Sequence, residues 1–308
     1  MEFPSFYNPN RVGTLYVPDT AGAIQAGQSA HIPPAEEDRQ RVLLLLVDAQ
    51  VDFIHPDGAL SVPGAVDDTR RTIEWLFRNM DQVTTITASL DTHLPLQIFF
   101  QSWWVGPAGE HPAPYTPITA KDVEQGVWRP AVEPEWSVQY VHQLAEQAKK
   151  TLMIWPYHTM LGTPGHSITP ALYEAIAYHA AARQTQPILL AKGSIPRTEH
   201  YSILEPEVKV PDEPLGGLNT PLLETIATYD LIYVAGQAKS HCVLETVTSL
   251  FRYFAERQPD FIRRWRFLKD CTSSVKHPEI DFDALANAEL AKFEAQGMRM
   301  VTSTDPIG

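Results

Sequence analysis

Cysteine is scarce in this sequence. Only two cysteines, Cys242 and Cys271, occur in 308 residues. Two thiols in so long a chain do not make the disulfide framework of a small secreted protein. We therefore expect a reducing, cytoplasmic environment.

Positive charge and long apolar runs are also lacking. The 24 Lys and Arg residues are outnumbered by 37 Asp and Glu residues, which gives a formal net charge of −13. A surface of this sign disfavours nucleic acids and anionic membranes as partners. The longest obvious apolar run, at 42–47, is far shorter than the roughly 18–20 residues that cross a bilayer. The first residues show neither the basic nor the apolar segment of a signal peptide.

The length and the 44% hydrophobic content suit one large α/β domain with additions. Residues 1–40 are rich in Pro, Gly, Ala and polar residues without a period. They predict an extended arm that lies on the domain or on a neighbouring subunit, and residues 41–308 predict the domain itself. Within that domain, Pro, Gly and aromatic residues replace any regular pattern from 94 onward. We expect a long insertion at about 94–150 that serves as a lid or an oligomer contact.

Outside these two regions, strand-like and helix-like segments alternate along the chain. Strands are predicted at 41–48, 83–90, 187–191, 231–235, 266–269 and 298–302. Helices are predicted at 63–80, 135–150, 170–183, 220–229, 243–255 and 282–296. This alternation predicts a three-layer α/β/α fold with a six-stranded parallel sheet.

Four of the predicted strands end in chemically active residues, namely Asp48, Asp91, Lys192 and the turn that carries Cys242. Open parallel sheets place their sites at the carboxyl ends of the strands, so these side chains converge on one rim. An acid can take the proton of a thiol, and an ammonium can stabilise the thiolate. The strand-to-helix turn also offers backbone N–H groups and a helix dipole, which favour a thiolate and an oxyanion. The alternative interpretation of Cys242 is a small buried residue at the start of a core helix.

A metal site is predicted beside this set. In an extended segment, Asp91 and His93 point to the same side. His158 offers a third ligand, and two imidazoles with one carboxylate suit Zn, Fe or Mn. His111 in the insertion either completes this shell or is a solvated loop histidine.

Together these segments resemble the isochorismatase-like cysteine hydrolases, and within them the nicotinamidases. Val47-Asp-Ala-Gln-Val-Asp-Phe53 resembles the D-x-Q-x-D-F start of that family. The later family motifs follow in the same order, as Asp91-Thr-His93, Trp155-Pro-x-His158, Lys192-Gly193 and Gly236-x-Ala-x-x-x-Cys-Val243. The resemblance covers residues 41 to about 302. The sequence also departs from the usual pattern: Lys239-Ser240 replaces Thr-Asp, and Glu199-His-Tyr-Ser202 lies in the region where Asp-Ser-Tyr-Ser is usual. The insertion between His93 and His158 is longer than usual, and the amino-terminal arm is extra.

The resemblance implies a role for each site residue. Asp48, Lys192 and Cys242 would form the catalytic triad, and Asp91, His93 and His158 would bind one divalent metal ion. The ion is expected to be zinc, with iron or manganese as alternatives. Phe53 and Trp155 would sandwich a pyridine ring, and the backbone amides of Ala238 and Cys242 would form the oxyanion hole. The family's cis peptide would fall at Gln237–Ala238.

The implied function is hydrolysis of nicotinamide to nicotinate and ammonia through a Cys242 thioester, by a homo-oligomer that acts on a small amide. Three alternatives stay open: a hydrolase for another small amide, a non-haem iron oxygenase, and a non-enzymatic relative that serves assembly. Oxygenases of that kind usually have all-β barrels, which the alternation of strands and helices disfavours. Cys271 has no basic partner in the sequence and is predicted to be structural.

Overall fold

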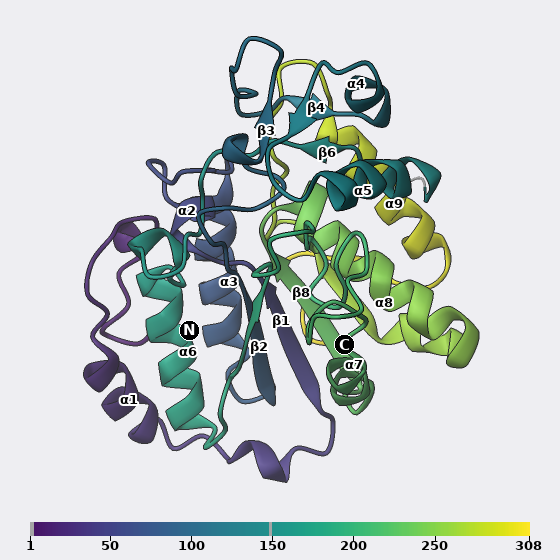
Figure 1. The fold of residues 1–308 in the computed structure, drawn as a ribbon. Coiled ribbons are helices and arrows are strands. Elements are labelled where there is room, and N and C mark those ends of the chain that lie inside the picture. Colours follow the sequence, from purple (N-terminus) through teal and green to yellow (C-terminus); the bar gives the residue numbers. More distant parts are fainter. Residues whose placement is uncertain (1–2, 148–149) are drawn as a thin grey trace.

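The computed structural model describes residues 3–147 and 150–308. Its centre is a six-stranded sheet in the order β10-β9-β8-β1-β2-β7, in which every pair of neighbours is parallel (Figure 1). The strands are β1 (Val42–Val47), β2 (Thr85–Asp91), β7 (Ile188–Lys192), β8 (Leu231–Gly236), β9 (Trp265–Leu268) and β10 (Arg299–Val301). The predicted α/β architecture and its six strands are confirmed.

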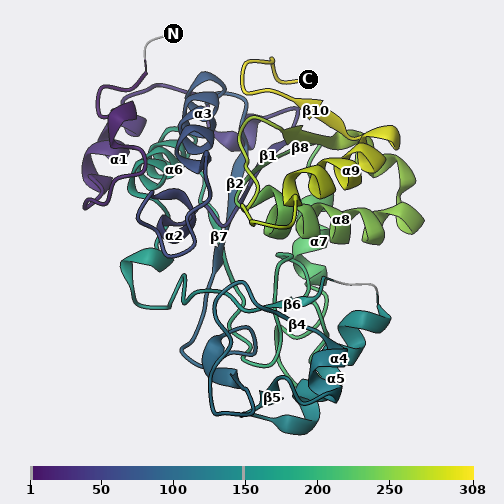
Figure 2. The same cartoon turned by 90° about the horizontal axis from the view of Figure 1, so that it is seen from above.

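The apolar run at 42–47 becomes the central strand β1, and all of its residues are buried. Such a strand is covered by helices on both faces, as parallel sheets require. Figure 2 shows α1, α3 and α6 on one side of the sheet and α7, α8 and α9 on the other. The helices that flank the sheet are α1 (Thr20–Gln28), α2 (Val51–Ile54), α3 (Ala65–Arg78), α6 (Pro170–Ala182), α7 (Thr220–Ala227), α8 (Leu244–Arg257) and α9 (Phe282–Ala295).

The amino-terminal segment is not the extended arm that its composition predicts. It contains α1, which packs along α6, and two short 3₁₀ helices at Pro9–Arg11 and Ala35–Glu37. Asp19 caps α1 by accepting the N–H of Gly22 at 2.9 Å. The Arg183 guanidinium binds Asp38 and the Pro33 carbonyl, which fastens the end of the segment to the domain. The interpretation as an arm missed this helix because Ala and Gly fill the face that packs on α6, so no apolar stripe marks it.

The region from 94 onward forms a separate small layer above the carboxyl ends of the strands (Figure 1). It holds α4 (Ala120–Glu124), α5 (Pro134–Glu146) and two antiparallel pairs, β3 (Trp104–Val105) with β5 (Arg129–Pro130) and β4 (Pro117–Ile118) with β6 (Leu152–Met153). The buried indoles of Trp103 and Trp104 each donate a hydrogen bond, to Ser137 Oγ at 2.8 Å and to the Ile98 carbonyl at 2.6 Å. Satisfied buried indoles give this small layer a core of its own.

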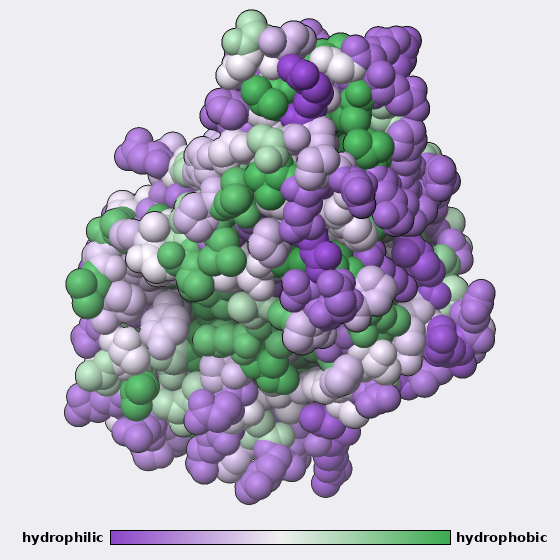
Figure 3. All heavy atoms as spheres, in the orientation of Figure 1, coloured by the Kyte–Doolittle hydropathy of each residue, from purple (hydrophilic) through white to green (hydrophobic). Residues whose placement is uncertain are grey.

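The edge strand β7 is only partly covered. Its Leu189 is 47% exposed and lines a hollow of about 670 Å³ together with Leu90 and Tyr173. Figure 3 shows hydrophobic residues gathered in the middle of this face of the molecule.

Within the described part of the chain, no helix is long and apolar enough to cross a membrane.

Candidate active site

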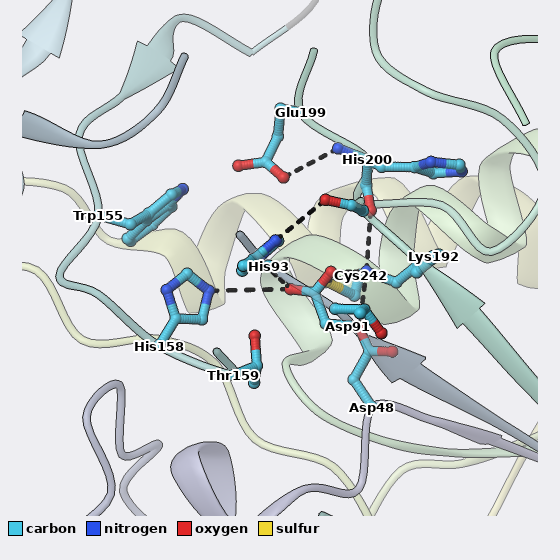
Figure 4. A network of polar contacts seen from close by, with 12 residues as sticks. Asp48, Asp91, His93, Trp155, His158, Thr159, Lys192, Glu199, His200 and Cys242 are labelled. Carbon is cyan, nitrogen blue, oxygen red and sulfur yellow. Dashed lines mark hydrogen bonds and ion pairs between the residues drawn. The ribbon is translucent and has the colours of Figure 1, made fainter. Parts of the chain in front are cut away.

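Four adjacent strands bring the predicted residues together on one rim. Asp48 follows β1, Asp91 ends β2, Lys192 ends β7, and Cys242 lies in a π-helical turn, Lys239–Val243, after β8. These strands are neighbours in the order β8-β1-β2-β7. Figure 4 shows their side chains pointing toward one another above the strand ends. Asp48, Asp91, Lys192 and Cys242 therefore lie together on one rim of the sheet, as their positions in the sequence predict.

The Lys192 ammonium is the centre of this arrangement. Its Nζ lies 2.9 Å from Asp48 Oδ2, 2.8 Å from Asp91 Oδ1 and 3.6 Å from Cys242 Sγ. It also donates a hydrogen bond to the His200 carbonyl at 2.8 Å. Burial lowers the pKa of this ammonium, but Asp48 and Asp91 outweigh burial and raise that pKa well above its usual range. The buried cation therefore stays charged between two carboxylates and a thiol.

Asp48 is held so that one of its oxygens faces the thiol side. The Ser89 hydroxyl donates to Asp48 Oδ1 at 2.6 Å and also accepts the Asp48 N–H at 3.0 Å. Oδ2 is left to Lys192. Burial raises the pKa of Asp48, although the Lys192 charge opposes the rise. A carboxylate with a raised pKa takes up a proton more readily, which suits a general base.

The Cys242 thiol does not have the depressed pKa that the turn predicts. Burial raises the pKa of this thiol well above its usual range, although Lys192 lowers it. Asp48 is a hydrogen-bond partner of the thiol and also favours its neutral form. Desolvation therefore outweighs the cation in its effect on the pKa of this thiol. The thiol instead keeps a proton that the neighbouring carboxylate can accept.

The turn before Cys242 has an unusual backbone. Gly236 has φ +118°, and a Cβ there would lie 2.0 Å from the Val47 carbonyl oxygen, so only glycine fits. The Gln237–Ala238 peptide is cis, as the resemblance implies. The Ala238 carbonyl accepts the N–H groups of His241 and Val243 at 3.0 and 3.2 Å. The role of the Ala238 and Cys242 amides as an oxyanion hole stays a prediction.

Three potential metal ligands lie next to the triad. One ligand atom each of Asp91, His93 and His158 lies within 4.8 Å of the other two, and all three residues are buried. Asp91 Oδ2 is 2.8 Å from His93 Nε2 and 3.8 Å from His158 Nε2. Burial opposes the ionisation of Asp91, but His93 and Lys192 hold its pKa well below the usual range. An anionic oxygen between two imidazoles is a donor set that fits a divalent cation.

Both imidazole rings are oriented by backbone carbonyls. His93 Nδ1 donates to the Gly193 carbonyl at 3.1 Å, and His158 Nδ1 donates to the Pro156 carbonyl at 2.8 Å. Because a carbonyl only accepts, each ring carries a proton on Nδ1 and turns its Nε2 atom toward Asp91. His93 Nε2 is buried, and Asp91 Oδ2 is its partner at 2.8 Å. Two imidazole nitrogens turned toward one carboxylate oxygen fit a metal ion.

Gly193 makes the close packing at the ligands possible. It has φ +82°, and a Cβ would lie 2.6 Å from Asp91 Oδ1 and 3.0 Å from His93 Cε1. His111 lies outside the cluster of Asp91, His93 and His158. Its Nδ1 contacts the Trp104 carbonyl at 2.6 Å, so the interpretation of a loop histidine holds.

The two aromatic residues expected to bind a ring lie near the metal ligands and the nucleophile turn. The Phe53 ring is 5.5 Å from the His158 ring. The Trp155 ring is 5.3 Å from the His241 ring, and its Nε1 donates to Tyr201 Oη at 3.1 Å. Whether Phe53 and Trp155 sandwich a substrate ring stays a prediction.

Several residues beside the site had no assigned role in the sequence. Gln50 accepts the Asp91 N–H at 2.7 Å and donates to the Asp91 carbonyl at 2.8 Å. Both Gln50 and Ser89 stand two positions from a predicted site acid, and that spacing could have identified them.

Glu199 is buried, and burial together with the Asp91 charge raises its pKa to about 7. No spacing signal points to Glu199.

Comparisons with known proteins support the fold. No family profile matches the sequence, and no curated protein matches it. Solved structures do match, with a TM-score of 0.56 for both the nicotinamidase/pyrazinamidase of Acinetobacter baumanii and the yeast nicotinamidase bound to the inhibitor nicotinaldehyde. The Acinetobacter match has 17% identity and covers 87% of this chain and 99% of that one. The yeast match has 19% identity and covers 85% of this chain and 99% of the yeast chain.

A third match, the L. infantum protein in complex with nicotinate, has a TM-score of 0.51 and 17% identity, and covers 87% of this chain and 95% of that one. At such identities the similarity concerns the fold. The chain has the nicotinamidase-like fold that its motifs predict.

Proposed function

We propose that this protein is a metal-dependent cysteine amidohydrolase whose substrate is nicotinamide. The observation that carries the proposal is the position of the Lys192 ammonium, 2.9 Å from Asp48 and 3.6 Å from the Cys242 sulfur. A nucleophile, a base and a cation thus meet beside a cluster of metal-ligand type. The nicotinamidases that share the fold support the choice of substrate.

In the first half of the reaction, Asp48 takes the proton of the Cys242 thiol as Sγ attacks the carboxamide carbon. The Lys192 ammonium stabilises the negative charge on sulfur before the C–S bond forms. The amides of Ala238 and Cys242 donate to the carbonyl oxygen as it becomes an oxyanion. The proton on Asp48 then passes to the leaving nitrogen, the C–N bond breaks, and ammonia departs from a thioester.

In the second half, Asp48 accepts a proton from a water molecule, whose oxygen attacks the thioester carbon. The same backbone amides hold the second oxyanion. The C–S bond breaks, the product leaves as the carboxylic acid, and the proton on Asp48 returns to sulfur. In water the acid gives its proton to the released ammonia, so atoms and charges balance as nicotinamide plus water giving nicotinate plus ammonium.

The metal ion would be held by Asp91 Oδ2 and the Nε2 atoms of His93 and His158. When bound, it supplies positive charge that a ring nitrogen can coordinate, directly or through water. Zinc suits this donor set, with iron and manganese as alternatives. Phe53 and Trp155 provide flat apolar surfaces for the pyridine ring.

The test is ammonia release by the purified full-length chain, loaded with zinc and supplied with nicotinamide. We expect turnover by the wild type and none by Cys242→Ala, whose zinc content stays equal to that of the wild type. Equal turnover by that variant would exclude cysteine chemistry.

A second candidate is a hydrolase for another small amide on the same triad. The observation that favours it is the buried Glu199-His200 pair, which lies beside the site where the related enzymes usually carry Asp and Ser. A panel of nicotinamide, maleamate and ureido compounds separates the candidates by kcat/KM. The all-parallel sheet disfavours an iron oxygenase, and oxygen uptake by an iron-loaded sample tests that alternative.

The expected homo-oligomer and the cytoplasmic location also stay predictions. Light scattering coupled to size exclusion measures the first, and fractionation of the source cells measures the second.

A further inference from the structure

Thr159 carries a hydroxyl that nothing in the proposed reaction uses. The residue is fully buried, and its Oγ1 has no hydrogen-bond partner among the described residues. Leaving a buried hydroxyl unpaired costs about 1–3 kcal/mol. A group of this kind at the edge of a site requires an explanation, and a ligand absent from the structure is one.

The backbone of Thr159 is fixed between two of the metal ligands. It follows His158 directly in the sequence, and its carbonyl accepts the His93 N–H at 3.1 Å. Its own N–H donates to Asp52 Oδ2 at 2.7 Å. The residue also has φ +45°, a left-handed conformation that a β-branched side chain rarely adopts.

This backbone directs the hydroxyl into the ligand cluster. Figure 4 shows Thr159 below His158 and Asp91, with its oxygen pointing into the space between them. That space is bordered by the ligand atom Asp91 Oδ2, which lies 2.8 Å from His93 Nε2 and 3.8 Å from His158 Nε2. A buried hydroxyl without a hydrogen-bond partner among the described residues therefore points toward the three atoms that would hold the ion.

We propose that Thr159 is a positioning residue of the metal centre, whose hydroxyl hydrogen-bonds a water ligand of the ion. Three protein ligands leave coordination positions that water fills. A threonine hydroxyl is a weak direct ligand for zinc but a good acceptor or donor for such a water. The inference rests on the metal centre of the proposed function and does not depend on which amide is hydrolysed.

The experiment compares Thr159→Val, which keeps the branched shape and loses the hydroxyl, with Thr159→Ser, which keeps the hydroxyl. The affinity of each full-length protein for Co²⁺ is measured by competition with a chromogenic chelator, and the visible spectrum of the Co²⁺ form is recorded. The control is Thr163→Val, because Thr163 is exposed and its hydroxyl donates to the Met160 carbonyl.

We expect Thr159→Val to weaken Co²⁺ binding about tenfold or more and to change the visible spectrum. Thr159→Ser and Thr163→Val should stay within about threefold of the wild type. Unchanged affinity and spectrum in Thr159→Val would overturn the inference, and so would equal losses in the Val and Ser variants, which indicate a packing role. A wild type that binds no Co²⁺ overturns it together with the metal site. A wild type that binds Co²⁺ but releases no ammonia overturns only the proposed reaction.

Discussion

The two cysteines occupy similar places and have different surroundings. Cys242 follows β8 and Cys271 follows the neighbouring strand β9, and both side chains are buried. Burial raises the pKa of both thiols, for Cys271 to about 12. The difference is a buried cation, since Lys192 Nζ lies 3.6 Å from the Cys242 sulfur. The cation that acts on Cys271 is Arg71, whose side chain is 40% exposed, and Lys269, two residues before Cys271, is exposed.

The proposed reaction requires more than a buried thiol at a strand end. Cys271 has an acid nearby, because its sulfur lies 3.8 Å from Asp270 Oδ1. That acid is bound elsewhere, since Asp270 accepts the hydroxyl and the N–H of Ser303. The proposed chemistry at Cys242 therefore requires a base and a buried cation together.

The largest expected effect is on turnover. Cys242→Ala should lower ammonia release by at least about 10⁴-fold, because the nucleophile is removed. Cys271→Ala should keep kcat within about twofold, since that thiol touches no site residue. Steady-state kinetics with nicotinamide measure both. Similar losses in the two variants would contradict the contrast between the thiols.

Removing the cation should be the next most severe change. Lys192→Met leaves Asp48 and Asp91 buried beside an apolar chain, so we expect about 3–5 kcal/mol of destabilisation and a fall of about 10²–10³-fold in kcat. Urea unfolding and kinetics measure the two effects. The matched control is Lys269→Met at the exposed lysine, for which we expect less than about 0.5 kcal/mol.

The third prediction concerns alkaline stability. Burial raises the pKa of Cys271 from 9.0 to about 12, so the folded state keeps a proton that the unfolded state loses above pH 9. The stability from this thiol is complete below pH 9 and is lost as the pH rises toward 12. Between pH 9 and 11 the loss amounts to about 2–3 kcal/mol. Urea unfolding at pH 7, 9 and 11 should show a shallower decline for Cys271→Ala than for the wild type, and an equal decline would contradict the prediction.

The smallest effect is expected from the hydroxyl that orients the base. Ser89→Ala removes the 2.6 Å hydrogen bond to Asp48 Oδ1, and a loss of about 1–1.5 kcal/mol in alignment lowers kcat about tenfold. Ser137→Ala is the control, since Ser137 is also buried and hydrogen-bonded but lies in the insertion against Trp103. The control should lose stability without losing kcat. An unchanged kcat in Ser89→Ala would mean that Lys192 alone orients Asp48.

The sheet and its rim could be predicted because each strand has a local signal. The run at 42–47 is apolar throughout, and Asp91 and Lys192 directly end their strands, where parallel pairing places them side by side. The motif order then identified the ligand cluster. These features depend on the hydrophobic pattern of each strand and on which residue ends it, and a sequence shows both directly.

Other features depend on contacts that a sequence does not show. The α1 helix is recognised by its packing on α6, where Gly27 would clash with the Tyr178 carbonyl if it carried a Cβ. The pairing of Trp104 with Pro130 joins two-residue strands, which are too short for a period. The raised pKa of Cys242 follows from burial beneath distant segments. The partnerless hydroxyl of Thr159 likewise becomes visible only once its neighbours are placed.

The position of β8 in the sheet has a consequence for synthesis. β1 pairs on one edge with β2, which follows it closely in the sequence, and on its other edge with β8, whose residues come much later (Val42 opposite Leu231). Domains generally fold as units, so this domain is incomplete until β8 has been synthesised. A growing chain therefore holds both acids and the lysine before it has any thiol, so a product truncated before residue 242 lacks the proposed nucleophile. One edge of the apolar strand β1 also stays unpaired in such a product, which favours aggregation.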